Sequence, residues 1–353
     1  MLELWDESTD LFGEVSRYLD AEGFFAGARP DSVADVFFAY RISERLRRTE
    51  PPPRPEPCPL PLAACRIVSP GEAETRGSFS LGEWEATWAP DKYAAAVESV
   101  RAAIARGDVY QVNLVQHLSA PFDGDPAGLA GALAPLEPLH PEPLVGDGWA
   151  IVSGSPELFL SRRGDQVTTM PIKGTRPAEA DGLRASTKDA AEHVMIVDLE
   201  RNDLSRVCRA GTVRWPELMV ERRLAGVSHL VSTVTGTLRP EVSFGDILAV
   251  TFPGGSITGA PKIAAIDHIA ALEPVGRGAS MGALGRIYPN GDFDLALTIR
   301  TFAVAEGRIH FWVGGGIVWD SDPAAEIEES WVKARPLLAA VASAAHAPVG
   351  ARA

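Results

Sequence analysis

Three charged side chains near the carboxyl end of the chain are spaced for one face of a helix. Glu326, Glu329 and Lys333 lie three and four residues apart, so a helix that begins at Pro323 places them on one stripe. The preceding Asp320-Ser-Asp sequence and the proline are typical of a helix start. Spacing alone leaves a solvated, salt-bridged surface open as the alternative to a binding site.

A second acidic helix is predicted over residues 186–203, and it carries Glu192. Mg²⁺ binds a small number of protein oxygens and keeps water or substrate oxygens for its remaining positions. Carboxylates that come from two different helices suit this ion. The two acidic helices therefore indicate magnesium as a cofactor.

Two glycine-rich segments are predicted to approach a ligand closely. Residues 252–262 form a loop that opens into a helix, where backbone N–H groups can hold an anion. The Lys-Ser/Thr pair of a phosphate-binding P-loop is absent, so a carboxylate ligand is favoured over a nucleotide. Gly314, Gly315 and Gly316 also permit close backbone approach. Tight turns that serve only the fold remain the alternative for both segments.

The composition limits the classes of function. A formal charge of −14 argues against a nucleic-acid partner but allows a small anionic substrate. No stretch approaches the roughly 20 apolar residues that cross a bilayer. The first residues have no basic and apolar leader, and the three cysteines form no Cys-x-x-Cys pair. We therefore expect no secretory signal, no membrane contact, reduced thiols and a cytoplasmic location.

The chain that must position these side chains divides into three predicted segments. Residues 1–50 form a reduced N-terminal segment, residues 51–90 a proline-rich connector with edge strands, and residues 91–345 the main domain. The fold class is α+β, with layered antiparallel sheets and flanking helices. The expected helices are 11–19, 93–105, 186–203, 260–271 and 323–344, and Gly107 is expected to end the second of them. The expected strands are 109–118, 149–162, 166–172, 285–288, 295–304 and 309–318, with a hairpin turn at Asn290-Gly291.

From about residue 91 to residue 340 the sequence resembles the chorismate-utilising enzymes, the family of anthranilate, aminodeoxychorismate and isochorismate synthases. The resemblance implies a chorismate-binding catalytic domain with its active site between antiparallel sheets. The matching motifs occur in the family order, at residues 107–114, 154–159, 171–175, 192–199, 229–232, 252–262, 296–301 and 314–321.

The resemblance also implies a role for each matching residue. Glu157 matches the general acid that protonates the departing 4-hydroxyl, and His229 matches a histidine near the substrate, although a purely structural histidine remains the alternative. Glu192 and Glu329 match the Mg²⁺ ligands, with Glu326 as a nearby carboxylate. The positions that hold the substrate carboxylates and the metal are Gly174, Thr175, Arg300, Gly314, Gly315, Gly316 and Lys333.

Two positions sort the family by nucleophile. Isochorismate-forming members use a lysine where this chain has Gln111, and an amide cannot act as that base. Lys173, in Pro171-Ile-Lys-Gly-Thr175, is typical of the branch that makes 4-amino-4-deoxychorismate on the para-aminobenzoate and folate route. A neutral lysine amine can act as a covalent nucleophile there. Ammonia would come from a separate glutamine amidotransferase subunit.

Three alternatives remain open: an anthranilate synthase, a 2-amino-2-deoxyisochorismate synthase, and a chorismate-binding or scaffolding protein without turnover. Two residues also depart from the family pattern. Arg286 stands where relatives usually have a tyrosine beside the substrate, so we expect an altered carboxylate contact or a shifted specificity. His117 replaces a common arginine.

Overall fold

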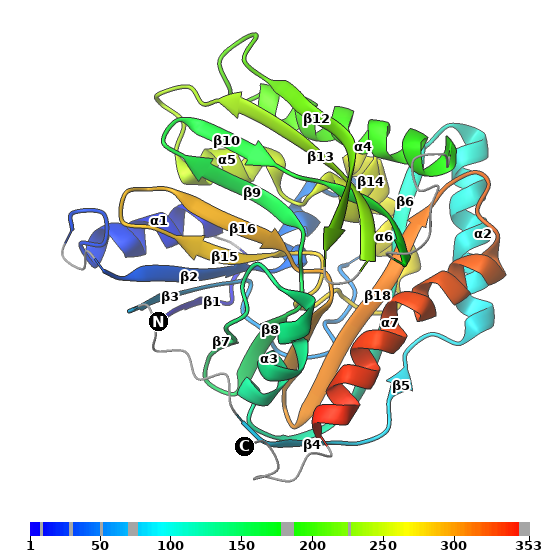
Figure 1. Cartoon of the computed structure of the whole chain (residues 1–353). Coiled ribbons are helices and arrows are strands. Elements are labelled where there is room, and N and C mark those ends of the chain that lie inside the picture. Colours follow the sequence, from blue (N-terminus) through cyan, green and yellow to red (C-terminus); the bar gives the residue numbers. More distant parts are fainter. Residues whose placement is uncertain are drawn as a thin grey trace.

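Two antiparallel sheets, with helices packed on their outer faces, build the protein (Figure 1). The computed structural model describes residues 1–7, 10–27, 31–49, 52–69, 77–177, 187–224 and 227–345; within these ranges the side chains of residues 175–177, 187–189, 223–224 and 227 are not described. This architecture confirms the expected α+β class and the layered antiparallel sheets.

The larger sheet has ten strands and includes strands from the first 90 residues. Because β2 pairs with β15, the amino-terminal strands extend the same sheet that holds the motif at residues 171–175. Its order is β1 (Leu2–Leu4), β3 (Ala63–Val68), β2 (Val33–Phe38), β15 (Ala283–Ile287), β16 (Phe293–Leu297), β9 (Leu158–Arg163), β10 (Gln166–Thr169), β13 (Val227–Thr237) and β11 (Ile172–Pro177), with β12 (Arg214–Leu224) paired to β13.

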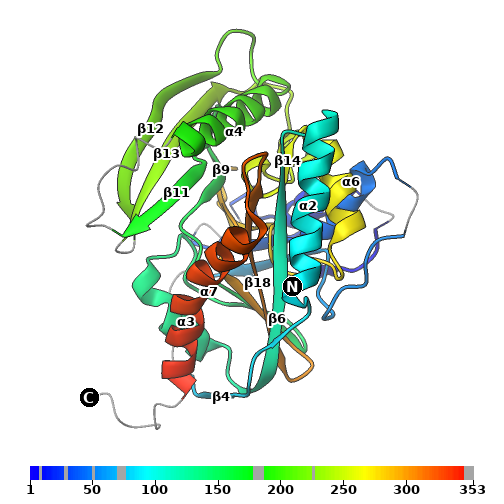
Figure 2. The same ribbon diagram turned by 90° about the vertical axis from the view of Figure 1, so that its right-hand side faces the viewer.

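The smaller sheet has eight strands and centres on two long ones. Its order is β14 (Gly259–Ala260), β6 (Gln111–Gly124), β18 (Arg308–Ile317), β17 (Thr301–Ala305), β8 (Trp149–Ser153) and β7 (Leu144–Val145), while β4 (Phe79–Leu81) and β5 (Glu85–Ala86) also pair with β6. In Figure 2, α7 (Pro323–Ala345) lies in front of β18, and α2 (Pro90–Arg106) runs beside β6.

The remaining helices are α1 (Leu11–Ala21), α3 (Ala127–Leu133), α4 (Thr187–Ser205), α5 (Phe244–Thr251) and α6 (Lys262–Leu272), with short 3₁₀ turns η1 (Tyr40–Leu46), η2 (Ala134–Leu136) and η4 (Gly255–Ile257). The α2 helix ends at Gly107 in the left-handed conformation, φ 79°, as the sequence predicted. Within the described residues, no helix is long and apolar enough to span a membrane.

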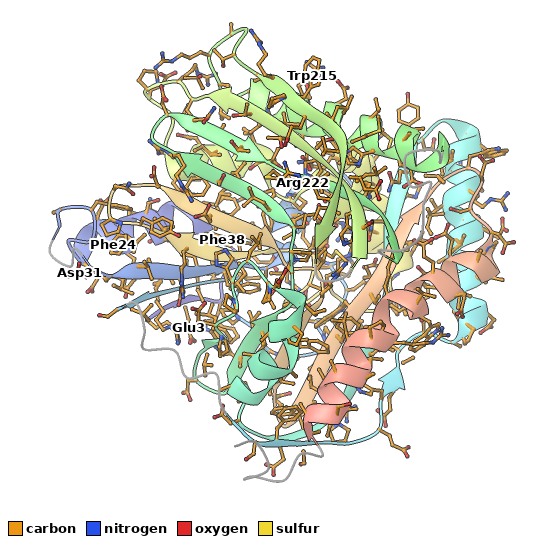
Figure 3. All side chains as sticks on the ribbon, in the orientation of Figure 1. Glu3, Phe24, Asp31, Phe38, Trp215 and Arg222 are labelled. Carbon is orange, nitrogen blue, oxygen red and sulfur yellow. The ribbon has the colours of Figure 1, made fainter. Side chains whose placement is uncertain are left out.

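A continuous apolar core joins the two sheets to the helices around them. Phe38 of β2, labelled in Figure 3, packs edge to face on Phe12 of α1 with ring centroids 5.1 Å apart. The same core includes Val112 of β6 and Leu160 of β9, which belong to different sheets. A second core, around Phe302 and Phe311, lies between the smaller sheet and helices α3 and α7.

Two expected strands are each broken in the structure, and those predictions were wrong. Residues 149–162 form β8 in the smaller sheet and β9 in the larger sheet, with a crossing segment at residues 154–157. Residues 295–304 are divided in the same way between β16 and β17. The second crossing includes Arg300, whose positive φ of 50° is incompatible with a continuing strand.

The expected hairpin at Asn290-Gly291 is confirmed. Gly291 has a φ of 82°, and the N–H of Tyr288 donates to the carbonyl oxygen of Asp292 at 2.9 Å. The hairpin pairs β15 with β16.

The first glycine of the 314–316 run is required by strand packing. A Cβ atom on Gly314 would lie 1.8 Å from the carbonyl oxygen of Leu114 in β6, and one on Gly316 would lie 1.9 Å from Nε2 of Gln111. A side chain on Gly314 would therefore force backbone apart, because the overlapping atom is a main-chain oxygen. The glycine run is therefore required by the packing of β18 against β6, in addition to any role in ligand binding.

Gly314→Ala should reduce the free energy of unfolding by about 1–3 kcal/mol, the usual cost of overpacking. Gly245→Ala is the matched control, because Gly245 lies in helix α5 and a Cβ atom there would have no neighbouring atom closer than 3.6 Å. The control should be neutral or slightly stabilising. Urea unfolding of both variants measures the difference, and equal stabilities would contradict the packing argument.

Candidate active site

A cavity of about 170 Å³ lies where the two sheets meet α7. Both sheet crossings line it, since Pro156 and Glu157 come from the first and Ile299 and Arg300 from the second. The structure therefore brings together most residues that the family resemblance implied. These are Glu157, Lys173, Gly174, His229, Arg300, Gly314, Gly315, Gly316 and Lys333.

Glu157 is held in a site suited to a proton donor. One of its carboxylate oxygens accepts the hydroxyl of Ser256 at 2.9 Å and the backbone N–H of Ile172 at 3.3 Å. Burial raises the pKa of Glu157, and the Ser256 hydroxyl and the nearby Lys173 charge oppose that rise. A carboxyl with a raised pKa retains its proton closer to neutral pH, as a general acid requires.

Lys173 reaches the same turn from β11. Its Nζ donates to the carbonyl oxygen of Ser256 at 3.2 Å. Burial lowers the pKa of the Lys173 ammonium, whereas the carboxylates of Glu192 and Glu157 raise it. The resulting pKa of Lys173 lies below the ordinary lysine value, which increases the fraction of neutral, nucleophilic amine.

His229 supports the strand that carries Lys173. It lies opposite Thr175 in the β11–β13 pairing, and its Nδ1 is 3.1 Å from the carbonyl oxygen of Gly174. The ladder shifts register between Lys173 and Thr175, and Gly174 there has a φ of 66°. Burial lowers the pKa of His229, so the neutral imidazole is favoured. The side chain of Thr175 lies outside the described part of the chain.

The predicted stripe on α7 faces the glycine run. A Cβ placed on Gly315 would lie 3.4 Å from Lys333 Nζ, 3.6 Å from a Glu326 oxygen and 3.7 Å from a Glu329 oxygen. Lys333 Nζ contacts Glu329 at 2.8 Å and donates to the carbonyl oxygen of Gly314 at 3.1 Å. Glu326 is buried and accepts the hydroxyl of Ser321 at 2.6 Å.

The same carboxylates form a donor set of hard oxygens suited to Mg²⁺. Glu326 and Glu329 converge over Gly315, where a side chain would occupy the space between them and the sheet. Glu192, on α4, lies near enough to Lys173 for its carboxylate charge to raise the pKa of that lysine. Within the described ranges, no group of three or more metal-binding side chains is already assembled. Water and substrate oxygens would therefore have to complete the coordination.

Arg300 occupies a conformation that few side chains adopt. Its left-handed φ of 50° is of the kind that costs on the order of 1–3 kcal/mol. Its carbonyl oxygen accepts the N–H of Gly154 at 2.9 Å, which fixes the backbone of Arg300 where this residue lines the cavity. A strained residue held in this way fits the anion-binding role that the sequence suggested.

A buried ion pair that the sequence patterns did not predict lies behind the cavity lining. Arg277, 2% exposed, pairs with Glu273 at 2.7 Å. It also donates to the carbonyl oxygens of Ile257 at 3.0 Å and Asn113 at 2.8 Å, and both of these residues line the cavity. The spacing of four between Glu273 and Arg277 was visible in the sequence, but their burial was not.

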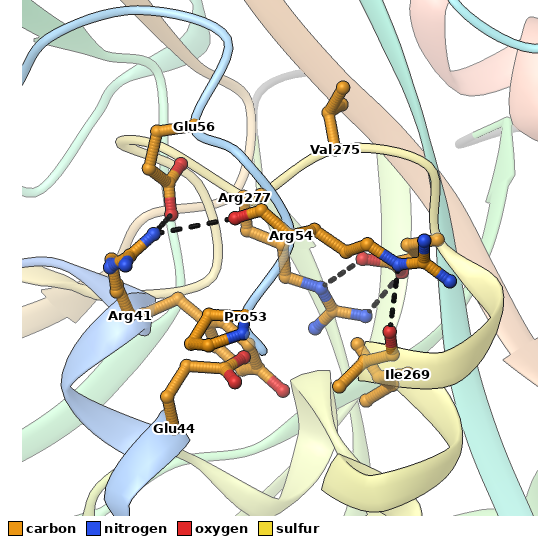
Figure 4. Close-up of a pocket in the computed structure, with 12 residues that line it drawn as sticks. Arg41, Glu44, Pro53, Arg54, Glu56, Ile269, Val275 and Arg277 are labelled. Atoms are coloured by element: carbon orange, nitrogen blue, oxygen red, sulfur yellow. Dashed lines mark hydrogen bonds and ion pairs between the residues drawn. The ribbon is translucent and has the colours of Figure 1, made fainter. Parts of the chain in front are cut away.

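Figure 4 shows the opposite side of this pair, where a cavity of about 20 Å³ opens toward η1. Arg277 lies 4.5 Å from the ring centroid of Tyr40, and Arg41 contacts Glu56 at 3.8 Å. This volume accommodates about one water molecule. The space therefore has no room for a ligand of substrate size.

Two departures from the family pattern lie away from the cavity lining. Arg286 pairs with Asp35 at 2.8 Å and Glu142 at 3.2 Å, and it is not among the residues that line the cavity. His117 is 3.1 Å from His310 and packs against Trp312, which does line the cavity. Gln111 is buried in β6 behind Gly316.

Comparisons with known proteins agree with this geometry. Residues 40–339 match the model of a family described as chorismate binding enzyme. Anthranilate synthase component 1 of Streptomyces coelicolor is 39% identical over 325 residues, which cover 88% of this chain and 60% of that protein. Aminodeoxychorismate synthase component 1 of Klebsiella aerogenes is 40% identical over 280 residues, which cover 75% of this chain and 61% of that protein.

The solved structure of anthranilate synthase component I from Streptococcus pneumoniae has a TM-score of 0.77 and 27% identity, covering 88% of this chain and 81% of that chain. The chain spans about 60% of the length of the curated relatives named above. The two kinds of synthase match at similar identity. The family model covers most of the chain, and we conclude that the chain belongs to the chorismate-binding enzyme family.

Proposed function

We propose that the protein makes 4-amino-4-deoxychorismate from chorismate and ammonia, through a covalent intermediate on Lys173, and thereby supplies para-aminobenzoate formation on the folate route. The observation that carries this proposal is the placement of Lys173. Its amine lies in the cavity, against the Ser256 carbonyl and beside Glu157, with its pKa lowered by burial. A relative of this chain is an aminodeoxychorismate synthase component 1.

The reaction consists of two allylic displacements on one bound ring. The neutral amine of Lys173 attacks C2, both ring double bonds shift by one position, and the C4 hydroxyl leaves as water with the proton of Glu157. The alkylated lysine loses a proton, which restores Glu157. Ammonia then attacks C4, both double bonds shift back, and Lys173 departs from C2 with the proton that ammonia releases. The net change replaces one hydroxyl by one amine and forms one water.

The remaining cavity residues bind and orient the dianionic substrate. Arg300 and Lys333 supply positive charge, and the backbone of Gly174 and of the 314–316 run permits close approach. Glu192 and Glu329, with Glu326, would hold Mg²⁺, which when bound would neutralise a substrate carboxylate. Holding one ring in place allows both displacements to occur without release.

A separate amidotransferase subunit is proposed to supply the ammonia. The relatives compared above are each named as component 1 of a synthase. Glutamine hydrolysis of the cysteine type needs a thiolate, whereas burial raises the pKa of Cys65 to about 12 and that of Cys208 to about 11, and also raises the pKa of Cys58. These three thiols are therefore poorly suited to release ammonia within this chain.

Anthranilate synthase is the second candidate, because a relative of that name is 39% identical. The two candidates differ in the position of the new amine, C4 or C2. Identification of the product by mass spectrometry and NMR, after incubation with chorismate, Mg²⁺ and ammonium, decides between them. Formation of anthranilate by the wild-type protein would refute our proposal.

Lys173→Ala should lower formation of the 4-amino product by roughly two orders of magnitude or more, equivalent to about 3 kcal/mol of lost transition-state stabilisation. Ammonia could then attack C2 directly, so a slow 2-amino product is expected. Lys173→Arg should not restore the 4-amino product, because the guanidinium stays protonated. Wild-type rates of 4-amino product from Lys173→Ala would exclude the covalent route.

Glu329→Ala should lower turnover by roughly 100-fold or more while leaving the fold intact, because a hard-cation ligand is lost. Glu328→Ala is the matched control on the same helix, since Glu328 is exposed and pairs with Arg335. Activity of the wild type should disappear with EDTA and return with Mg²⁺. Full activity in EDTA, or equal activity of the two variants, would remove the metal from the proposal.

A further inference from the structure

A second buried carboxyl lies behind the turn that holds Glu157 and Lys173, and the proposed mechanism does not use it. Glu200, on α4, is 7% exposed and accepts the hydroxyl of Thr169 at 3.0 Å. A cavity of about 10 Å³ adjoins it, lined in part by Thr251, Gly254 and Gly255. The volume is at the lower limit for one water molecule.

The turn at residues 255–256 separates this carboxyl from the active site. A Cβ on Gly255 would lie 3.7 Å from Cγ of Glu200, so the turn packs directly on α4. The next residue, Ser256, donates its hydroxyl to Glu157 and accepts from Lys173 through its carbonyl oxygen. Glu200 also bonds Thr169. The next residue, Met170, donates its N–H to the carbonyl oxygen of Leu158, which follows Glu157 in the chain. Glu200 therefore contacts both segments that position the catalytic groups.

The charged groups facing Glu200 come from four places. Glu157 faces it from the first sheet crossing, Lys173 from β11, Lys262 from α6 and Asp203 from its own helix. Lys262 is already paired with Asp203 and also donates to the carbonyl oxygen of Thr251 at 2.9 Å. Thr251 of α5 also lines this cavity, and its hydroxyl donates to the carbonyl oxygen of Ile247 at 2.8 Å. Glu157 is therefore the nearby carboxylate whose charge changes during the proposed reaction.

We infer that Glu200 is a positioning residue that acts through Glu157: it stays protonated while the enzyme works, and its ionisation opposes proton donation by Glu157. Two buried carboxyls close to each other resist carrying two negative charges. When Glu157 gives its proton to the leaving hydroxyl, Glu157 becomes negatively charged. A neutral Glu200 does not repel this negative charge. An ionised Glu200 would raise the pKa of Glu157 and make it a weaker acid. This inference rests on the proposed function for its catalytic consequence.

Burial is the main reason that Glu200 can remain neutral. It raises the pKa of Glu200 to about 8, with Glu157 as a further raising charge, while the Thr169 hydroxyl lowers it. At neutral pH most of the protein therefore carries the protonated form. Above about pH 8 the carboxylate accumulates, and the proposed reaction should slow.

The coupling can be measured without substrate, by infrared titration of the carboxylic-acid carbonyl band that Glu200→Gln removes. The wild-type midpoint should lie near pH 8. Glu157→Gln should move that midpoint to lower pH, because a neighbouring negative charge is lost. Thr169→Val should move it to higher pH, because the hydroxyl that stabilises the carboxylate is lost. A midpoint in the ordinary carboxyl range, or one that Glu157→Gln leaves in place, would overturn the inference.

The catalytic consequence is tested by the ratio of kcat between Glu200→Gln and wild type across pH, since the ratio cancels the titration of ammonia itself. The ratio should be constant at neutral pH and rise by up to about tenfold per pH unit above about pH 8. Thr169→Val keeps the Glu200 carboxyl and should move the loss of kcat at alkaline pH to higher pH. This variant also tests the inference if Glu200→Gln fails to fold. A flat ratio would refute the role of Glu200. If the infrared coupling is found but no 4-amino product forms, the proposed function fails instead.

Discussion

The site depends on two places where the chain passes from one sheet to the other. Hydrogen bonds join these crossings: the N–H of Gly154 donates to the carbonyl oxygen of Arg300 at 2.9 Å, and that of Leu297 donates to the carbonyl oxygen of Glu157 at 3.0 Å. Because each crossing holds the other, the backbone positions that carry Glu157 and Arg300 keep a fixed separation. In the proposed mechanism, the proton donor and the anion-binding arginine are therefore both positioned by backbone bonds that join the two sheets.

The buried pair of Arg277 and Glu273 also holds the backbone of the cavity lining in place. Arg277 holds two carbonyl groups of the lining, and Glu273 accepts the N–H of Val115 in β6 at 3.0 Å. Loss of one member of such a pair typically costs about 3–5 kcal/mol, because the other charge is left buried alone. The pair therefore contributes more to the shape of the site than an exposed ion pair of similar length could.

Local signals in the sequence predicted local features well. Gly107 as a helix end, the Asn290-Gly291 hairpin and the stripe formed by Glu326, Glu329 and Lys333 all follow from spacing and backbone preference over a few residues. The two broken strands were not predictable in this way, because alternation of apolar residues continues through a change of sheet. Glu200 and Arg277 were missed for a related reason: burial of a charged side chain is decided by tertiary packing, and a single sequence does not record it.

Lys173 differs from Glu157 and Arg300 in where the fold places it. It lies on β11, the last strand in the order of the larger sheet, beside a register shift. The backbone bonds that join the crossings, and the buried pair of Arg277 and Glu273, do not involve the side chain of Lys173. In the proposed mechanism, the general acid and the anion-binding arginine thus lie on the joined crossings, whereas the nucleophile lies on the last strand of the sheet. A substitution at position 173 would then change the nucleophile while the backbone bonds that position Glu157 and Arg300 stay in place.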